Sequence, residues 1–203
     1  MTSSYSEAVG DRADLERGIY PDAHSPVTIT VETAIDNEHA ETFYELYLAA
    51  FGPLRTRAAA RQVLHHGEFF AEMTDARVWK YVAWADDETP IALTTITKSL
   101  ETVPWISPEY FRARYPEYAA RDAIYYLGFS LVHPENRYPR VLEQTFRLAM
   151  KRLVADRAIC AYDICAYNEQ YGFSDRIQRL LHRLGDLDVV PIDNQTYYYV
   201  RFG

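Results

Sequence analysis

The stretch Ile124-Tyr-Tyr-Leu-Gly-Phe-Ser-Leu-Val-His-Pro-Glu-Asn-Arg137 joins the most apolar segment of the chain to a polar junction. Its apolar part predicts a buried, central strand over 124–132, because strands covered on both faces have nearly continuous apolar runs. His133-Pro134 ends this strand. Beyond the junction, apolar residues recur at helical spacing and predict a helix from residue 139 or 140 to about residue 156. A central strand followed at once by a helix is the element around which the rest of the fold is predicted.

The other elements follow from the periodicity of apolar residues and from the positions of Gly and Pro. The predicted strands cover 27–33, 78–84, 91–97, 159–166 and 196–202, and the predicted helices cover 36–51, 57–66 with a continuation at 69–73, and 174–184. Residues 100–122 predict a structured insert with short helices that start at Pro108 and Pro116. The sequence therefore predicts one α/β domain over 27–203, a mixed and mostly antiparallel sheet flanked by helices, after a flexible N-terminal arm over 1–26.

The composition is that of a folded protein, with 203 residues, 48% apolar residues, 25% charged residues and a net charge of −8. The acidic balance argues against a nucleic-acid partner. Because the chain has no signal sequence and no apolar stretch of membrane-spanning length, we expect a cytoplasmic protein that does not bind a membrane. Cys160 and Cys165 would lie about 16 Å apart along one strand, which excludes a disulfide and predicts two small core residues.

The pair His65-His66, with Glu68 and Glu72 nearby, is the strongest candidate for a metal site. Adjacent histidines point in different directions on a helix, and Gly67 interrupts the helix predicted there. We therefore expect no metal.

The order of the elements, together with Ser130-Leu-Val-His-Pro-Glu-Asn-Arg137, resembles the GCN5-related N-acetyltransferase (GNAT) superfamily. In that family a leucine, a valine, a proline and then an arginine or glutamine follow the fourth strand and precede the cofactor loop. The order of elements resembles the family over about 27–203, and the individual residues over about 130–142. The resemblance implies a GNAT-like sheet that splays between the strands at 124–132 and 159–166, where the pantetheine arm of the acyl donor enters.

The resemblance also implies a donor site in which strand backbone holds the pantetheine and helix N-terminal amides hold the pyrophosphate. The candidate residues for it are Leu131, Val132, Arg137, Tyr138, Arg140, Val141 and Asn168. The family loop has the pattern Gln/Arg-x-x-Gly-x-Gly/Ala, whereas this chain has Arg140 and Leu142 at the two small positions, and Pro139 lacks an N–H. Either the loop only connects two elements, or Arg137 and Arg140 bind phosphate through their guanidinium groups instead.

The family's proton-donating tyrosine would fall at Leu181, so His182 and Tyr171 are the candidates for that role. Tyr125 and Tyr126 occupy the positions where the family often places the proton acceptor. Alternation along a strand sends their side chains to opposite faces, so one of the two is expected to face the site. Each of these four residues also fits an ordinary surface or packing role.

Two functions follow from the resemblance. The first is an acyltransferase that moves an acyl group from a phosphopantetheine thioester, either acetyl-CoA or an acyl carrier protein, to an amine of a small molecule. The second is a catalytically silent GNAT-fold protein that binds a ligand or a partner. Six basic residues against three acids over 135–157 would suit an acidic carrier protein. The aromatic insert over 100–122 is expected either to cover the acceptor pocket, or to pad the edge of the sheet or form a homodimer contact.

Overall fold

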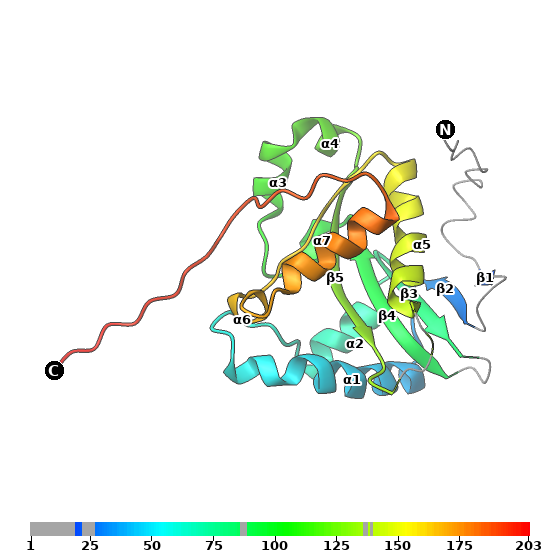
Figure 1. Ribbon diagram of the computed structural model, residues 1–203, viewed down its shortest axis with the longest axis horizontal. Helices are drawn as coiled ribbons and strands as arrows, with labels where there is room; N and C mark the ends of the chain where they lie inside the picture. Colours follow the sequence, from blue (N-terminus) through cyan, green and yellow to red (C-terminus); the bar gives the residue numbers. More distant parts are fainter. Residues whose placement is uncertain (1–18, 22–26, 86–88, 136–137, 139) are drawn as a thin grey trace.

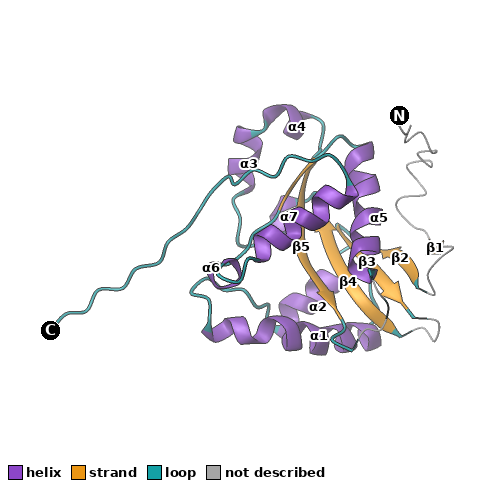
Figure 2. Ribbon diagram, viewed as in Figure 1, coloured by secondary structure: helices purple, strands orange, loops and turns teal. Residues whose placement is uncertain are grey.

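The structure, a computed structural model, describes residues 19–21, 27–85, 89–135, 138 and 140–203. Within these residues six strands form one sheet in chain order: β1 (Ile19–Pro21), β2 (Thr28–Glu32), β3 (Val78–Trp84), β4 (Pro90–Thr97), β5 (Ile124–Val132) and β6 (Ile159–Ala161). Neighbouring strands are antiparallel except β5 and β6, which are parallel. The chain is therefore a single α/β domain with a mixed, mostly antiparallel sheet, as the sequence predicts (Figures 1 and 2).

Helices cover both faces of this sheet. They are α1 (Asn37–Phe51), η2 (Gly52–Thr56), α2 (His66–Thr74), η3 (Leu100–Thr102), α3 (Pro108–Arg114), α4 (Pro116–Ala120), α5 (Val141–Ala155), α6 (Ala166–Glu169) and α7 (Phe173–Leu184). On one face, Phe43 of α1 and Phe69 of α2 pack against Phe129 of β5. On the other face, Leu148 of α5 packs in a second apolar cluster with Tyr125. This arrangement leaves β5 covered on both faces, as its apolar sequence predicts.

The insert forms a third apolar cluster over the start of β5. Its two short helices begin where the sequence predicts, and the Ser107 hydroxyl caps α3 by accepting a hydrogen bond from Tyr110 N at 3.4 Å. Phe111 from α3 packs with Ile124 and Tyr126 of β5. The insert therefore lies beside the strand that carries Tyr126, as expected from its position in the sequence.

β5 contains an irregularity where it passes α2. The partners of Thr94 and Ile96 on β4 are Ser130 and Leu127, so β5 holds one more residue than β4 across this step. Gly128 lies in it, and a Cβ atom there would approach Thr95 Oγ1 to 2.5 Å and Glu72 Oε1 to 3.3 Å. A glycine is needed at this position because the neighbouring strand and helix leave no room for a side chain.

We expect Gly128→Ala to lower the free energy of unfolding by about 1–3 kcal/mol, because the added methyl group overpacks a buried site. Gly67→Ala is the matched control, since a Cβ at Gly67 in α2 meets nothing within 4 Å. The control should leave stability unchanged or raise it by up to about 1 kcal/mol, as alanine favours helix. Urea denaturation of both variants measures the difference. Equal stability of the two variants would contradict the tight contact around Gly128.

The sequence-based boundaries are wrong in three places. Residues 57–65 contain no helix, and α2 starts at His66, where Glu68 Oε2 accepts a hydrogen bond from His65 N at 2.8 Å and fixes the first turn. β6 ends at Ala161 instead of residue 166, and the chain turns toward α6. The predicted strand at 196–202 joins no strand pair among the described residues, because this segment lies away from the sheet (Figure 1) and a strand forms only beside another strand.

Residues 1–18 and 22–26 of the predicted N-terminal arm lie outside the described residues, whereas residues 19–21 form β1 beside β2. Cys160 and Cys165 are free thiols, and Cys165 is buried in the core, as predicted. Of the helices that the structure describes, none combines the length and the apolar character needed to cross a bilayer.

Candidate functional site

The candidate site lies where β5 and β6 part. The two strands pair at Ile124↔Ile159, Tyr125↔Cys160 and Tyr126↔Ala161, and no further. β5 then continues from Leu127 to Val132, and among the described residues no strand lies beside this second half on the β6 side. A strand edge without a neighbouring strand is the kind of edge to which an extended ligand adds by backbone hydrogen bonds. β6 pairs with β5 over all three of its residues and then ends, so the expected splay between 124–132 and 159–166 stays a prediction.

A buried tyrosine and an exposed carboxylate meet at the last paired position. Tyr126, whose side chain is 1% exposed, donates a hydrogen bond from its hydroxyl to Asp163 Oδ1. Trp105 of the insert directs its indole N–H at both groups, with Nε1 at 3.2 Å from Tyr126 OH and 3.2 Å from Asp163 Oδ1. We call Trp105, Tyr126 and Asp163 the Asp163 cluster. It joins the insert, β5 and the segment after β6.

Electrostatics assign different roles to the two oxygen-bearing groups of the cluster. Burial and the adjacent Asp163 carboxylate raise the pKa of Tyr126 well above its ordinary value, so its hydroxyl stays protonated and acts as a donor. Tyr126 and Trp105 both donate to Oδ1 of Asp163, which fixes the orientation of this exposed carboxylate. A carboxylate held in this way can accept a hydrogen bond, and then a proton, from a cationic group that approaches from solvent.

A second carboxyl group reaches β5 two residues beyond Tyr126. Glu72 projects from α2, where a Cβ at Gly128 would lie 3.3 Å from its Oε1. Burial raises the pKa of Glu72, although a hydrogen bond with Thr95 and the nearby charge of Lys80 oppose the rise. Glu72 therefore places a carboxyl group with a raised pKa next to the free half of β5.

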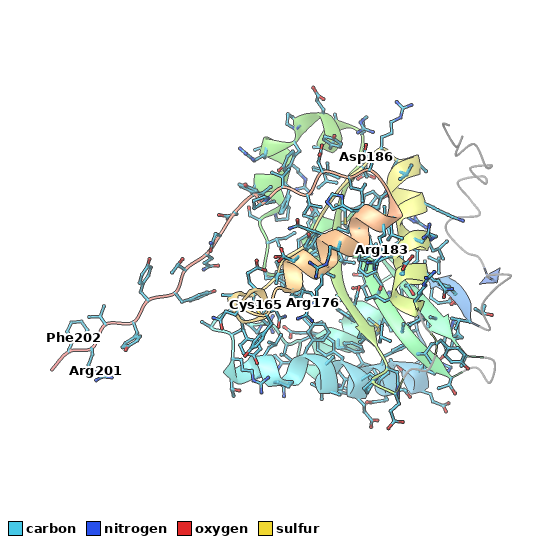
Figure 3. The ribbon with its side chains drawn as sticks, in the orientation of Figure 1. Cys165, Arg176, Arg183, Asp186, Arg201 and Phe202 are labelled. Carbon is cyan, nitrogen blue, oxygen red and sulfur yellow. The ribbon has the colours of Figure 1, made fainter. Side chains whose placement is uncertain are left out.

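An arginine lies at the N-terminus of α5. Arg140, the N-cap residue of α5, adopts the left-handed conformation with φ 64° and ψ 14°. This is the position that the GNAT pattern fills with glycine, the residue that adopts this conformation without steric cost. In the first turn of α5, the Glu143 carboxylate lies 3.2 Å from Arg147 Nη2 and 4.0 Å from Arg183 Nε of α7 (Figure 3). The turn before α5 therefore has a residue in the left-handed conformation, and that residue is an arginine.

The other predicted catalytic residues lie apart from the Asp163 cluster. Tyr125 points to the opposite face of β5, where its hydroxyl donates to Asp156 Oδ2 at 2.5 Å and its ring stacks on Trp79. Tyr171 is 60% exposed and contacts the ring of Tyr167. His182 is exposed on α7. Of the four candidates, the structure brings only Tyr126 together with polar partners at the parting of the strands.

The described donor-site candidates lie on the second half of β5, at or just before the start of α5, and in α6. Leu131 and Val132 lie on the free half of β5, with the Leu131 side chain in the core and its backbone paired to Leu93 of β4. Val141 is the first residue of α5, and its side chain is buried, so a ligand can reach only its backbone. Residue Arg137 lies outside the described residues. The remaining candidates are Tyr138, which packs on the second apolar cluster, Arg140, which is exposed, and Asn168, which lies in α6.

The predicted basic surface over 135–157 is smaller than the sequence suggests. Arg152 is buried: its guanidinium carbon lies 4.0 Å from the centre of the Trp79 ring, and its Nε donates to Tyr81 OH at 3.1 Å. The prediction that Arg152 contributes to a basic surface is therefore wrong, because an arginine can bury its charge against aromatic groups. Among the described residues of this range, the exposed basic residues are Arg140, Arg147, Lys151 and Arg157.

Sequence reasoning missed Asp163 and the role of Glu72 beside β5. One signal was present for Asp163, since ligand-binding residues often follow the carboxyl ends of parallel strands. No local signal marks Glu72, because its approach to Gly128 depends on how α2 packs on the sheet.

Comparison of the sequence with protein-family models found no match, and comparison with curated proteins found none either. The resemblance to the GNAT superfamily therefore stays a prediction from the sequence.

Proposed function

We propose that this chain is an acyltransferase that moves an acyl group from a phosphopantetheine thioester to an amine of a small molecule. The observation that carries the proposal is the second half of β5, which has no described strand beside it after Tyr126↔Ala161 and leads at Val132 into a strand-to-helix junction that resembles the GNAT pattern. A strand edge followed by a helix N-terminus suits a ligand that has an extended arm and a pyrophosphate.

On the donor side, strand-like hydrogen bonds from the free half of β5 hold the pantetheine. The first-turn amides of α5 and the Arg140 guanidinium bind the phosphates. The left-handed backbone at Arg140 supports this fit, because it is a conformation that glycine adopts readily, and glycine is the residue of the GNAT pattern at this position. The donor supplies an activated acyl group, and the chain supplies binding and orientation.

On the acceptor side, the proposal assigns the substrate ammonium to the Asp163 carboxylate, beside the Trp105 ring. An ammonium must lose a proton before its nitrogen can attack, and Asp163 accepts that proton directly or through water. The amine nitrogen then forms a bond to the thioester carbonyl carbon, the carbon–sulfur bond breaks, and the leaving thiolate takes up the second proton that the nitrogen loses as it becomes an amide. Tyr126 keeps the carboxylate oriented throughout, because its raised pKa keeps it a donor.

The test begins with binding. Coenzyme A, acetyl-CoA and a phosphopantetheine-loaded acyl carrier protein are added separately to the full chain, and the Tm is measured. A ligand at 100 times its Kd stabilises the native state by about 2.7 kcal/mol, so at least one of the three should raise the Tm. No shift with any of them at millimolar CoA would contradict the proposal.

Turnover is then measured as thiol release with a panel of primary amines. Release that needs both donor and amine supports the enzyme. Stabilisation without any release would favour the alternative from the sequence, a binding protein of the same fold.

Arg140 gives the sharpest test of the donor site. We expect Arg140→Gly and Arg140→Ala to weaken CoA binding equally, by about 1.5–3 kcal/mol, since each removes a charge-assisted bond. They should differ in stability, because glycine adopts the left-handed conformation at no steric cost and alanine does not. Isothermal titration and urea denaturation measure the two effects. Arg77→Ala, which removes another exposed arginine with an Asp75 ion pair, is the control. Unchanged affinity in both Arg140 variants would reduce the loop to a connector.

A further inference from the structure

The last segment of the chain has the composition of a β-strand but lies away from the sheet (Figure 1). We propose that this segment, Thr196–Phe202, adds to the outer edge of β6 in a second copy of the chain, so that two copies exchange their C-termini in a twofold dimer. We call Thr196–Phe202 the C-terminal arm. The proposal is independent of the proposed acyl transfer.

The arm has the composition of a strand and the exposure of an unpartnered one. Its sequence, Thr-Tyr-Tyr-Tyr-Val-Arg-Phe, consists almost entirely of β-branched and aromatic residues. Tyr198, Tyr199 and Phe202 are 89%, 84% and 89% exposed. Figures 1 and 3 show the arm running straight out from the body, with Arg201 and Phe202 near its end. Large aromatic side chains exposed side by side mark an interaction surface.

The edge that suits this arm is the outer side of β6. β6 is the last strand of the sheet, and within the described residues no strand covers its other side. Ile159 N donates to Ala123 O, toward β5, at 3.1 Å. Backbone groups alternate in direction along a strand, so those of Cys160 and Tyr162 point outward. An extended segment can pair with these groups, as in strand addition to an exposed edge.

The chain just before the arm packs against the same apolar cluster as the edge strand. Tyr110 OH donates to Ile192 O at 3.1 Å, and Ile192, like Ile159 and Ala161 of β6, packs against the third apolar cluster. Asp193-Asn194 follows, a pair that favours a turn, yet the chain does not turn back. Residues 193–195 therefore form an open hinge before a segment with strand composition. This arrangement is the one expected of an element that two copies exchange.

The apolar area is sufficient for a stable dimer. Alternation puts two aromatic side chains of each arm on the face that packs, and each aromatic buries about 150–250 Å². Two arms, counted with the surfaces that they cover, then bury about 1,200–2,000 Å² in total, the range of specific protein interfaces. The twofold arrangement pairs both arms and both edges, whereas an open chain of exchanges would leave one arm unpaired at one end and one edge unpaired at the other.

Sedimentation velocity from 1 to 100 µM tests the proposal. The full chain is expected to be a dimer, and a chain that ends at Gln195 is expected to be a folded monomer. Tyr199→Pro, in the middle of the arm, should weaken the dimer about 100-fold or more, since proline is excluded from a paired strand interior. Tyr171→Ser, which removes an exposed tyrosine from the body, should leave the dimer intact. A monomeric full chain, or a dimer that persists without the arm, overturns the proposal.

A shortened hinge separates exchange from pairing within one chain. Asn194 and Gln195 are the residues that a turn back to the same β6 would use, so deleting them disfavours pairing within one chain and keeps the arm itself intact. We expect this variant to remain a dimer. If the full chain is instead a monomer that loses thermal stability on removal of the arm, the arm pairs with its own β6, and the exchange is wrong.

Discussion

Asp163→Asn is expected to lower the rate of acyl transfer about 10²–10⁴-fold, the usual contribution of a positioned general base. An asparagine at this position keeps the hydrogen bonds of Tyr126 and Trp105 to its oxygen but can neither pair with an ammonium nor accept its proton. The loss should therefore appear in kcat/KM for the amine. Affinity for the acyl donor should stay unchanged, because Asp163 lies on the acceptor side of the proposed site.

Tyr126→Phe gives the matching result for a positioning residue. It removes the hydroxyl that orients the carboxylate while leaving the acid in place, so we expect a smaller loss, about 10-fold. Asp186→Asn, a change of another exposed acid just after α7, is the control and should have no effect. Steady-state kinetics with a fixed saturating donor and a varied amine measures all three variants. Full activity of Asp163→Asn would remove Asp163 from the mechanism.

Lys80→Met is expected to lower the free energy of unfolding by about 2–4 kcal/mol, a large effect for one side chain. Lys80 is fully buried in β3, and its Nζ donates to Thr33 O at 2.9 Å and to Asp75 O at 2.7 Å. Methionine fills a similar volume but leaves both carbonyl groups without this donor. It also removes the cation that opposes the rise in the pKa of Glu72.

Lys98→Met is the matched control, because Lys98 forms a more exposed ion pair with Asp122. Its loss should cost about 0–1 kcal/mol. Urea denaturation at pH 7 compares the two variants. Equal losses would show that the buried contacts of Lys80 contribute no more than a surface pair.

The same lysine predicts a pH dependence of stability. Burial lowers the pKa of Lys80 from 10.5 to about 8 in the folded chain. Between pH 8 and 10 the unfolded chain therefore binds more protons at this residue than the folded chain, and stability rises with pH. We expect the stability of the natural chain to gain on that of Lys80→Met over this range. A constant difference across pH 8–10 would show that the folded pKa is not lowered.

The sequence predicted most of the fold where one face of an element is buried by its own neighbours. The apolar run at 124–132 gave a strand covered on both faces, and Ser107-Pro108 gave the start of α3, because both signals are local. It failed at 57–65, where spacing alone suggested a helix but the hydrogen bond of His65 N to Glu68 starts α2 one residue later. Local periodicity reports burial, not which capping contact forms.

The candidate site depended more on tertiary structure. Tyr126 was a candidate from its strand position, but its partner Asp163 lies 37 residues away and Trp105 lies 21 residues away in the other direction. No periodicity links such residues. The parallel return of β6 and the packing of the insert bring them to one point.

The sequence by itself determined the order of the elements, the central strand and the strand-to-helix junction, because each depends on local chain propensities and the burial of one segment. Only the tertiary structure decided the contacts of Asp163 and Glu72, the burial of Lys80 and Arg152, and the open C-terminal arm. Hydrogen bonds, pKa values and strand edges depend on neighbours that are distant along the chain. The arm shows the difference most directly: its residues specify a strand, while the position of an unpaired edge decides where that strand can form.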